Sequence, residues 1–339
     1  MQGFHGVNVN EMMHIKGKCG YGVSIAVAQG KQVETYCTGS GRFAKNFPVQ
    51  PDMIFQAGSV SKTMFALTLL RCVDKGIIDL DADISGVVAD IVDRPVTFSA
   101  LLSHTAGFNV HGFAGYRARH RLLTLEDVLL GKGNSPKVKN VLPAGEQFSY
   151  SGGGITLAEL AFTRITGMTL RDAFAQEIAA PLELTQSGFF QPLDADRVAN
   201  AAFGGMLGIF EDRKHGYHYY PETAAAGFWS TPTELVKIGI ALSRSVRDGG
   251  LLRKETAERM VTPVKDRVGL CIFRGAEMPQ LAGHDGWNCG FLTTWKFSLT
   301  EDLCVAAMIN RANPSINRQL GELGKTLYIH AENEMMHRG

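Results

Sequence analysis

Ser59 and Lys62 are the pair of residues in this chain best suited to chemistry. They open and close the tetrad Ser-Val-Ser-Lys at the start of an apolar run that predicts a buried helix. Residues three apart on a helix share a face, so the amine can reach the hydroxyl and take its proton. The N-terminus of the helix adds free backbone N–H groups suited to a developing oxyanion. The spacing therefore predicts a serine nucleophile with a local base, against the alternatives of a helix N-cap serine and a lysine reaching solvent.

Three further segments carry polar residues in turn-rich surroundings. Tyr150 lies in residues 143–154, and His284, Asp285 and Gly286 lie just ahead of a strand-like run at residues 291–297. A Leu-Leu-Ser-His-Thr-Ala-Gly-Phe segment at residues 101–108 stands between the helix and Tyr150. A phenol has a pKa of roughly 10, so it needs a nearby cation to act as a base. The alternatives are a structural tyrosine and an ordinary histidine at a strand end.

The order, content and separations of these motifs resemble the serine β-lactamase and penicillin-binding-protein superfamily. Within it, the chain is most similar to class C β-lactamases, D-Ala-D-Ala carboxypeptidases and family VIII esterases, from about residue 21 to residue 311. The resemblance implies that Ser59 forms an acyl-enzyme, that Lys62 is the base or assists it, and that Tyr150 shuttles protons. Which of Lys62 and Tyr150 removes the first proton stays open.

The same resemblance assigns substrate contacts to the third motif. His284, Asp285 and Gly286 stand where the family has Lys-Thr-Gly, so His284 would offer a hydrogen bond or a partial positive charge. Gly286 would let a substrate backbone approach the strand closely. The backbone N–H groups of Ser59 and Trp287 would form the oxyanion hole. The family mechanism uses neither a metal nor an organic cofactor.

Two departures from the family pattern bear on the substrate. Gly152 stands where the family's Tyr-x-Asn motif has asparagine, which normally holds the amide of β-lactams and peptides, and His284 replaces a lysine. Losing a polar anchor lowers discrimination in favour of such substrates. We therefore expect a serine hydrolase of small esters, amides or short D-peptides with weak or no β-lactamase activity. The alternatives are an acyltransferase of small-molecule biosynthesis and a non-catalytic sensor or scaffold.

Composition limits the partners and the compartment. The 339 residues carry a formal charge of +1 with no basic block, which argues against nucleic acid, and no apolar run is long enough to span a bilayer. The start lacks an export signal, so we expect a cytoplasmic protein if Met1 is the native start, and a periplasmic or secreted one if a signal was removed. The spacing of the six cysteines favours buried thiols over disulfides, with Cys289 near the rim of the site. The sequence does not predict an oligomeric state.

The apolar pattern predicts the elements that must position these residues. Residues 23–28 and 32–38 form a hairpin, residues 55–75 a central helix, and residues 77–227 a mostly helical insert. Further strands are expected at residues 268–273, 291–297 and 303–309, before a closing helix at residues 319–331. Strands at both ends of the chain imply one antiparallel sheet. We therefore predict a β-lactamase-like α/β (α+β) fold, with a sheet domain of residues 1–76 and 228–339 and an inserted domain of residues 77–227.

Overall fold

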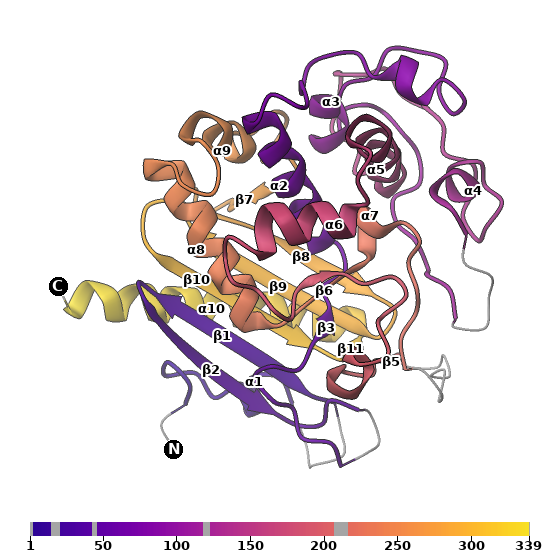
Figure 1. Ribbon diagram of the computed structural model, residues 1–339. Helices are drawn as coiled ribbons and strands as arrows, with labels where there is room; N and C mark the ends of the chain where they lie inside the picture. The colour runs from indigo at the N-terminus through magenta and orange to yellow at the C-terminus, as the bar shows by residue number, and fades with distance from the viewer. Residues whose placement is uncertain (1–2, 15–20, 43–45, 118–122, 207–215, 339) are drawn as a thin grey trace.

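The two ends of the chain build one antiparallel sheet in the computed structural model, which describes residues 3–14, 21–42, 46–117, 123–206 and 216–338. Six strands follow the order β2-β1-β10-β9-β8-β7 (Figure 1). Their bounds are β1 (Val23–Gln29), β2 (Gln32–Thr38), β7 (Phe273–Arg274), β8 (Leu281–Asn288), β9 (Phe291–Ser298) and β10 (Leu303–Ile309). The pairing of β1 with β10 joins the N-terminal hairpin to the C-terminal strands, as the sequence predicts.

The central strands are buried on both faces. Every residue of β1 and β10 is buried, which explains why both read as continuous apolar runs rather than alternating ones. The helix α8 (Pro232–Asp248) packs on one face of the sheet and α10 (Pro314–Arg338) on the other. The side chains of β10 accordingly divide between two hydrophobic cores, Cys304, Ala306 and Met308 on one face and Leu303, Val305, Ala307 and Ile309 on the other.

The helix that carries Ser59 lies in the larger core. This helix, α2 (Val60–Asp74), has twelve buried residues and contacts helices α5, α6 and α7 and strand β8. It ends at Asp74, and Gly76, which follows the C-cap residue Lys75, has a φ of +71°, a backbone conformation that favours glycine. The sequence predicted a helix from residue 55. That start is wrong, because Phe55 and Gln56 instead pair with Trp229 and Ser230 as a short strand.

The remaining helices are mostly short, and several of them pack against one another rather than on the six-stranded sheet. The remaining helices are α1 (Val9–Met12), α3 (Phe98–Leu102), α4 (Leu125–Leu129), α5 (Gly152–Thr166), α6 (Leu170–Phe174), α7 (Thr223–Ala226) and α9 (Lys254–Val261), with single turns η1 (Ser85–Val88), η2 (Ala175–Ala179) and η3 (Arg197–Asn200). Two small sheets pair β3 (Phe55–Gln56), β6 (Phe228–Ser230) and β4 (Gly188–Phe189), and β11 (Arg311–Ala312) with β5 (Gly205–Met206). The division into a sheet domain and an inserted domain stays a prediction.

Two strand predictions near the site need correction. The run at residues 268–273 predicts a full strand, but only Phe273 and Arg274 form β7, and Cys271 has a φ of +54° that interrupts an extended chain. His284 lies ahead of the strand at residues 291–297, as expected, but residues 281–288 also form a strand, β8, in which His284 pairs with Trp295 of β9. Since β7 begins at Phe273, opposite Gly283, its pairing with β8 does not extend to His284, and β8 contacts α2 instead.

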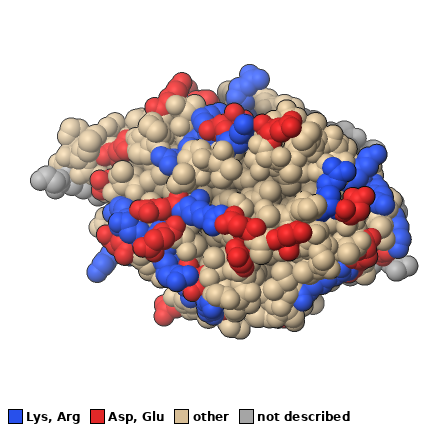
Figure 2. Space-filling model, turned by 90° about the horizontal axis from the view of Figure 1, so that it is seen from above, with Lys and Arg blue, Asp and Glu red and all other residues tan. Residues whose placement is uncertain are grey.

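The cysteines that the structure describes form no disulfide. They are Cys37, Cys72, Cys271, Cys289 and Cys304, and Cys19 lies outside the described residues. Positive and negative side chains are interspersed on the face seen in Figure 2. Within the described ranges, no helix is both long and apolar enough to cross a membrane.

Candidate active site

Ser59 lies at the first turn of α2 with its hydroxyl free of a capping role. Its side chain makes no cap hydrogen bond and is partly exposed, so the N-cap alternative does not apply. The neighbouring Ser61 is fully buried instead, donates to the Gly58 carbonyl and accepts from the Phe228 amide. The serine that reaches the surface is therefore Ser59, and Ser61 holds the turn that presents it.

Lys62 lies beneath Ser59, inside the protein. Its Nζ donates to Ser59 Oγ at 3.1 Å and to the Ala225 carbonyl at 2.7 Å, and the side chain is 2% exposed. The alternative of a lysine that reaches solvent is therefore wrong. Burial lowers the pKa of Lys62 to about 7, because water no longer solvates the ammonium group. A substantial fraction of the amine is neutral near pH 7.

Tyr150 closes the other side of Ser59. The phenol is hydrogen-bonded to Ser59, and Lys62 Nζ lies 5.0 Å from the centroid of the tyrosine ring. His104 packs against the ring at 4.5 Å between centroids and accepts from the Ser151 amide at 3.2 Å, which fixes the backbone next to Tyr150. Burial raises the pKa of Tyr150 above its usual value of 10, despite the hydrogen bond from Ser59 that lowers it. The phenol therefore holds its proton at neutral pH.

His284 reaches the site from β8. Its ring centroid lies 6.1 Å from that of Tyr150, and its Nδ1 is 2.6 Å from the backbone oxygen of Asp285. Nδ1 therefore carries a proton, and Nε2 is left without a hydrogen-bond partner among the described residues. Burial, and then the charge of Lys62, lower the pKa of His284 to about 4. At neutral pH the ring can accept a hydrogen bond but does not supply the positive charge of the lysine it replaces.

Backbone atoms of β8 lie directly against the N-terminus of α2. A methyl group added at Gly58, whose φ is +54°, would lie 2.5 Å from the Trp287 nitrogen. One added at Gly286 would lie 2.0 Å from the Ala57 oxygen and 3.3 Å from the Ser59 nitrogen. Glycine at both positions thus brings the nitrogens of Ser59 and Trp287 to the same small region, while the Trp287 side chain is 43% exposed at its edge.

We expect Gly286→Ala to lower kcat for an ester substrate by about 10²-fold, the effect of losing one oxyanion donor. The added methyl cannot fit against the Ala57 oxygen, so β8 must move away from α2. Stopped-flow or steady-state assays with a p-nitrophenyl ester would measure this. Gly86→Ala is the control, because nothing lies within 4 Å of the added methyl at that position. Equal activity in the two variants would contradict a role for this close approach.

The surroundings of Gly152 explain why it is not asparagine. A methyl group there would lie 3.0 Å from the Phe113 ring and 3.1 Å from the His111 oxygen, which itself accepts from the Gly152 amide at 3.1 Å. The His111 ring also packs on Tyr150, with 4.8 Å between centroids. The segment at residues 111–113 therefore occupies the space that a longer side chain would need.

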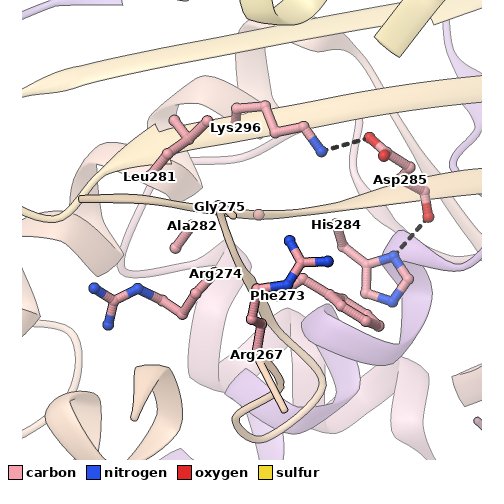
Figure 3. Close-up of a pocket in the computed structure, with 10 residues that line it drawn as sticks. Arg267, Phe273, Arg274, Gly275, Leu281, Ala282, His284, Asp285 and Lys296 are labelled. Carbon is pink, nitrogen blue, oxygen red and sulfur yellow. Dashed lines mark hydrogen bonds and ion pairs between the residues drawn. The ribbon is translucent and has the colours of Figure 1, made fainter. Parts of the chain in front are cut away.

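A cavity adjoins the site on the far side of His284. It has a volume of about 360 Å³, and Phe273, His284 and Arg267 line its inner wall (Figure 3). Phe273 contacts both the His284 ring at 5.0 Å and the Tyr150 ring at 6.4 Å. At its rim, Lys296 Nζ pairs with Asp285 Oδ1 at 2.8 Å. The cavity therefore meets the site at His284, while Ser59, Lys62 and Tyr150 are not among its lining residues.

Two neighbours of Lys62 and Tyr150 were not predicted from the sequence. The Ala225 carbonyl that accepts from Lys62 is a backbone group, so its residue type gives no signal. The sequence places Phe273 at the end of a predicted strand, and nothing in that pattern indicates that its ring contacts Tyr150 and His284. No group of three His, Cys, Asp or Glu side chains suited to a metal ion occurs within the described ranges.

The chain belongs to the Beta-lactamase family, whose model matches residues 15–324. It is similar to a lovastatin esterase of Penicillium rubens, 25% identical over 272 residues that cover 69% of this chain and 66% of the relative. It is also similar to the acyltransferase calJ of Penicillium decumbens, 32% identical over 249 residues that cover 64% of this chain and 58% of the relative. The chain thus spans about three fifths of the length of such relatives.

Solved structures share the fold. The D-amino acid amidase of Ochrobactrum anthropi SV3, solved with D-phenylalanine, aligns with a TM-score of 0.76 over 93% of this chain and 94% of that chain, at 19% sequence identity. This agreement confirms the predicted β-lactamase-like fold. The family and its relatives are hydrolytic or acyl-transfer enzymes.

Proposed function

We propose that this protein is a serine hydrolase that cleaves a small ester or amide through an acyl-enzyme on Ser59. The observation that carries the proposal is the contact of one hydroxyl with two proton-transfer groups, Lys62 Nζ at 3.1 Å and the hydrogen-bonded phenol of Tyr150. Nucleophile and base within hydrogen-bond reach are the requirement for covalent catalysis by serine. The lovastatin esterase among the relatives supports hydrolysis of an ester.

The proposed first step removes the Ser59 proton as its Oγ forms a bond to the substrate carbonyl carbon. The resulting oxyanion would accept from the backbone N–H groups of Ser59 and Trp287, which the glycines Gly58 and Gly286 bring together. The carbon then breaks its bond to the leaving alcohol or amine, which takes up a proton from the site. Water would attack the acyl-enzyme in a second round of the same proton transfers and release the acid.

The directions of the pKa shifts favour Lys62 as the first base. Its lowered pKa of about 7 leaves neutral amine available, whereas burial keeps the Tyr150 phenol protonated. Tyr150 would then donate its proton to the leaving group and recover one from Lys62. Deprotonated Tyr150 as the first base would need a cation strong enough to overcome this raised pKa.

Gly152 and His284 support weak β-lactamase activity at best. We expect turnover of a chromogenic cephalosporin to have a kcat/KM at least about 10²-fold below that of a p-nitrophenyl ester, because the amide anchor and the motif lysine are both missing. Gly152→Asn should not restore it, since the Phe113 ring and His111 oxygen fill the space. Steady-state assays of both proteins with both substrates would measure this. Rapid cephalosporin turnover by the unmodified protein would overturn this expectation.

An acyltransferase is the second candidate, favoured by the similarity to calJ at 32% identity. The acyl-enzyme would be the same, and an alcohol or amine would replace water in the second step. Mass analysis of the products formed with a competing alcohol separates the two functions. An acylated alcohol as the main product indicates a transferase, and free acid indicates a hydrolase.

Labelling with a fluorophosphonate tests the proposal before any substrate is known. The intact protein should gain one adduct by mass, and a panel of p-nitrophenyl esters, D-amino acid amides and a D-Ala-D-Ala peptide should then contain a substrate. A folded protein that takes no adduct and cleaves none of the panel would support a non-catalytic sensor or scaffold instead.

A further inference from the structure

The one-turn helix α7 lies between a buried carboxyl group and Lys62. At its N-terminal end, Glu159 Oε2 of α5 accepts from the Ala224 amide at 2.7 Å. The helix needs this bond because its own N-cap residue, Glu222, makes no side-chain cap hydrogen bond. At its other end, the Ala225 carbonyl accepts from Lys62 Nζ at 2.7 Å. A single turn of backbone thus links Glu159 to the amine beside Ser59.

Burial makes each of these contacts, from Glu159 to Ala224 and from Ala225 to Lys62, hard to replace by a contact with water. Glu159 is 4% exposed, Ala225 is 1% exposed and Lys62 is 2% exposed. A buried donor or acceptor that loses its partner has little water to replace it and pays the cost of desolvation. If α7 moved, the Lys62 amine would lose its 2.7 Å acceptor, and the position of Nζ relative to Ser59 Oγ would no longer be fixed.

We propose that Glu159 is a positioning residue, which through α7 holds Lys62 Nζ within hydrogen-bond distance of the Ser59 hydroxyl. The proposal rests on the proposed function only for its effect on rate. Its effect on the Lys62 amine can be measured in a protein with no known substrate. The mechanism itself gives Glu159 no contact with the substrate.

The carboxyl group can hold α7 in either protonation state. Burial, and to a smaller degree the nearby Glu222, raise the pKa of Glu159 to about 8, so that it is mostly neutral at pH 7. A neutral carboxyl keeps a carbonyl oxygen that accepts from the Ala224 amide. Other polar groups facing it are Thr223, which hydrogen-bonds to it, and Arg171 and Tyr219, which line a cavity of about 430 Å³ that Glu159 also reaches. Glutamine should therefore replace it with little loss.

The test compares Glu159→Ala with Glu159→Gln by NMR titration of ¹³Cε-labelled lysine, with Lys62→Met to assign the signal. Loss of the Ala225 acceptor disfavours the ammonium form, so we expect Lys62 to titrate about one pH unit lower in Glu159→Ala than in the unmodified protein. Glu159→Gln should titrate as the unmodified protein does. With an ester substrate, Glu159→Ala should lose about 10-fold to 10²-fold in kcat with KM nearly unchanged. The apparent pKa of the acid limb of its pH–rate profile should fall by the same amount as the Lys62 pKa.

Glu234→Ala is the matched control. Glu234 is also a buried acid, 5% exposed, and it accepts from the Thr185 and Gln186 amides rather than from α7. Glu234→Ala should lower the melting temperature of the protein and leave the pKa of Lys62 unchanged. If Glu159→Ala does not fold, Glu159→Leu fills most of the same volume without an acceptor for the Ala224 amide, and should lower the Lys62 pKa likewise.

Two results would overturn the positioning role. One is an unchanged Lys62 titration in the folded Glu159→Ala or Glu159→Leu protein, and the other is an equal change in Glu159→Gln and Glu159→Ala. Absence of both fluorophosphonate labelling and hydrolysis in the unmodified protein would count against the proposed function alone, since the titration does not depend on turnover.

Discussion

Ser59→Ala should lower kcat/KM for any ester substrate by about 10⁴-fold or more and should abolish the fluorophosphonate adduct. Alanine removes the Oγ that we propose forms the acyl-enzyme, while the remaining site would still bind substrate and polarise its carbonyl. The side chain is small, partly exposed and free of a capping bond, so the fold should persist. Intact-protein mass spectrometry and steady-state kinetics measure both effects.

Ser61→Ala is the control for this result, because Ser61 is the neighbouring hydroxyl on the same turn. It contacts the Gly58 carbonyl and the Phe228 amide and is fully buried. We expect a loss of roughly 1–3 kcal/mol in the free energy of unfolding, as for a buried amide left unpaired, with labelling retained in the folded protein. An adduct that persists in Ser59→Ala would show that another residue is the nucleophile.

Lys62→Met should have the second largest effect, a loss of about 10³-fold to 10⁴-fold in kcat/KM. Methionine matches the length of the lysine stem but cannot take the Ser59 proton. In the unmodified protein kcat/KM should fall tenfold per pH unit below about pH 7, because the ammonium form of Lys62 is no base. Lys62→Arg should be as inactive as Lys62→Met, since guanidinium stays charged throughout the pH range.

The same substitution should stabilise the protein. The pKa of Lys62 is about 7 in the folded state and near 10.4 in an unfolded chain, so unfolding takes up a proton between these values. Below pH 7 the folded state bears the full cost of a buried ammonium, and this cost disappears as the pH rises toward 10.4. Lys62→Met should therefore exceed the unmodified protein in free energy of unfolding by a few kcal/mol below pH 7, and by less as the pH rises.

Urea unfolding of both proteins at several pH values between 6 and 10 would measure that difference. Subtracting one protein's free energy of unfolding from the other's cancels the contributions of other buried groups. Glu159 and Glu222 are examples, because their raised pKa values make stability fall as the pH rises, whereas the lowered pKa of Lys62 makes it rise. A Lys62→Met protein that is less stable than the parent at pH 6 would contradict a buried, destabilising ammonium group. Activity retained by Lys62→Met would make Tyr150 the first base.

The sequence predicted the contact between Ser59 and Lys62 because a helix places residues three apart on a shared face. Ser59, Lys62 and the apolar stripe behind them lie within one element, so no tertiary information was needed to bring them together. The antiparallel sheet was predicted for a similar reason, since buried strands such as β1 and β10 read as unbroken apolar runs. The family resemblance then related Tyr150 and His284 to that pair.

Placement of residues near the ends of strands was less successful. The sequence around His284 contains Gly-His-Asp-Gly, which lowers strand propensity, yet pairing with β9 makes it the middle of β8. The pattern at residues 268–273 failed in the opposite direction, because the positive φ at Cys271 interrupts an otherwise β-prone run. Pairing with a neighbouring strand decides the first case and the backbone conformation of one residue decides the second, and local strand propensity reports neither of them.

The sequence by itself determined the class of fold and the pairing of Ser59 with the Lys62 amine, because these depend on local spacing and on apolar periodicity. Only the tertiary structure decided which proton-transfer group is poised at neutral pH, since the lowered pKa of Lys62 follows from its burial. The Ala225 carbonyl that accepts from Lys62 Nζ lies 163 positions away in the sequence. It also decided that Gly152 is enclosed by residues 111–113 and that Glu159 supports α7. Such properties depend on how closely segments that are far apart in the chain pack together, and on how well that packing excludes water. The local sequence contains no information about either.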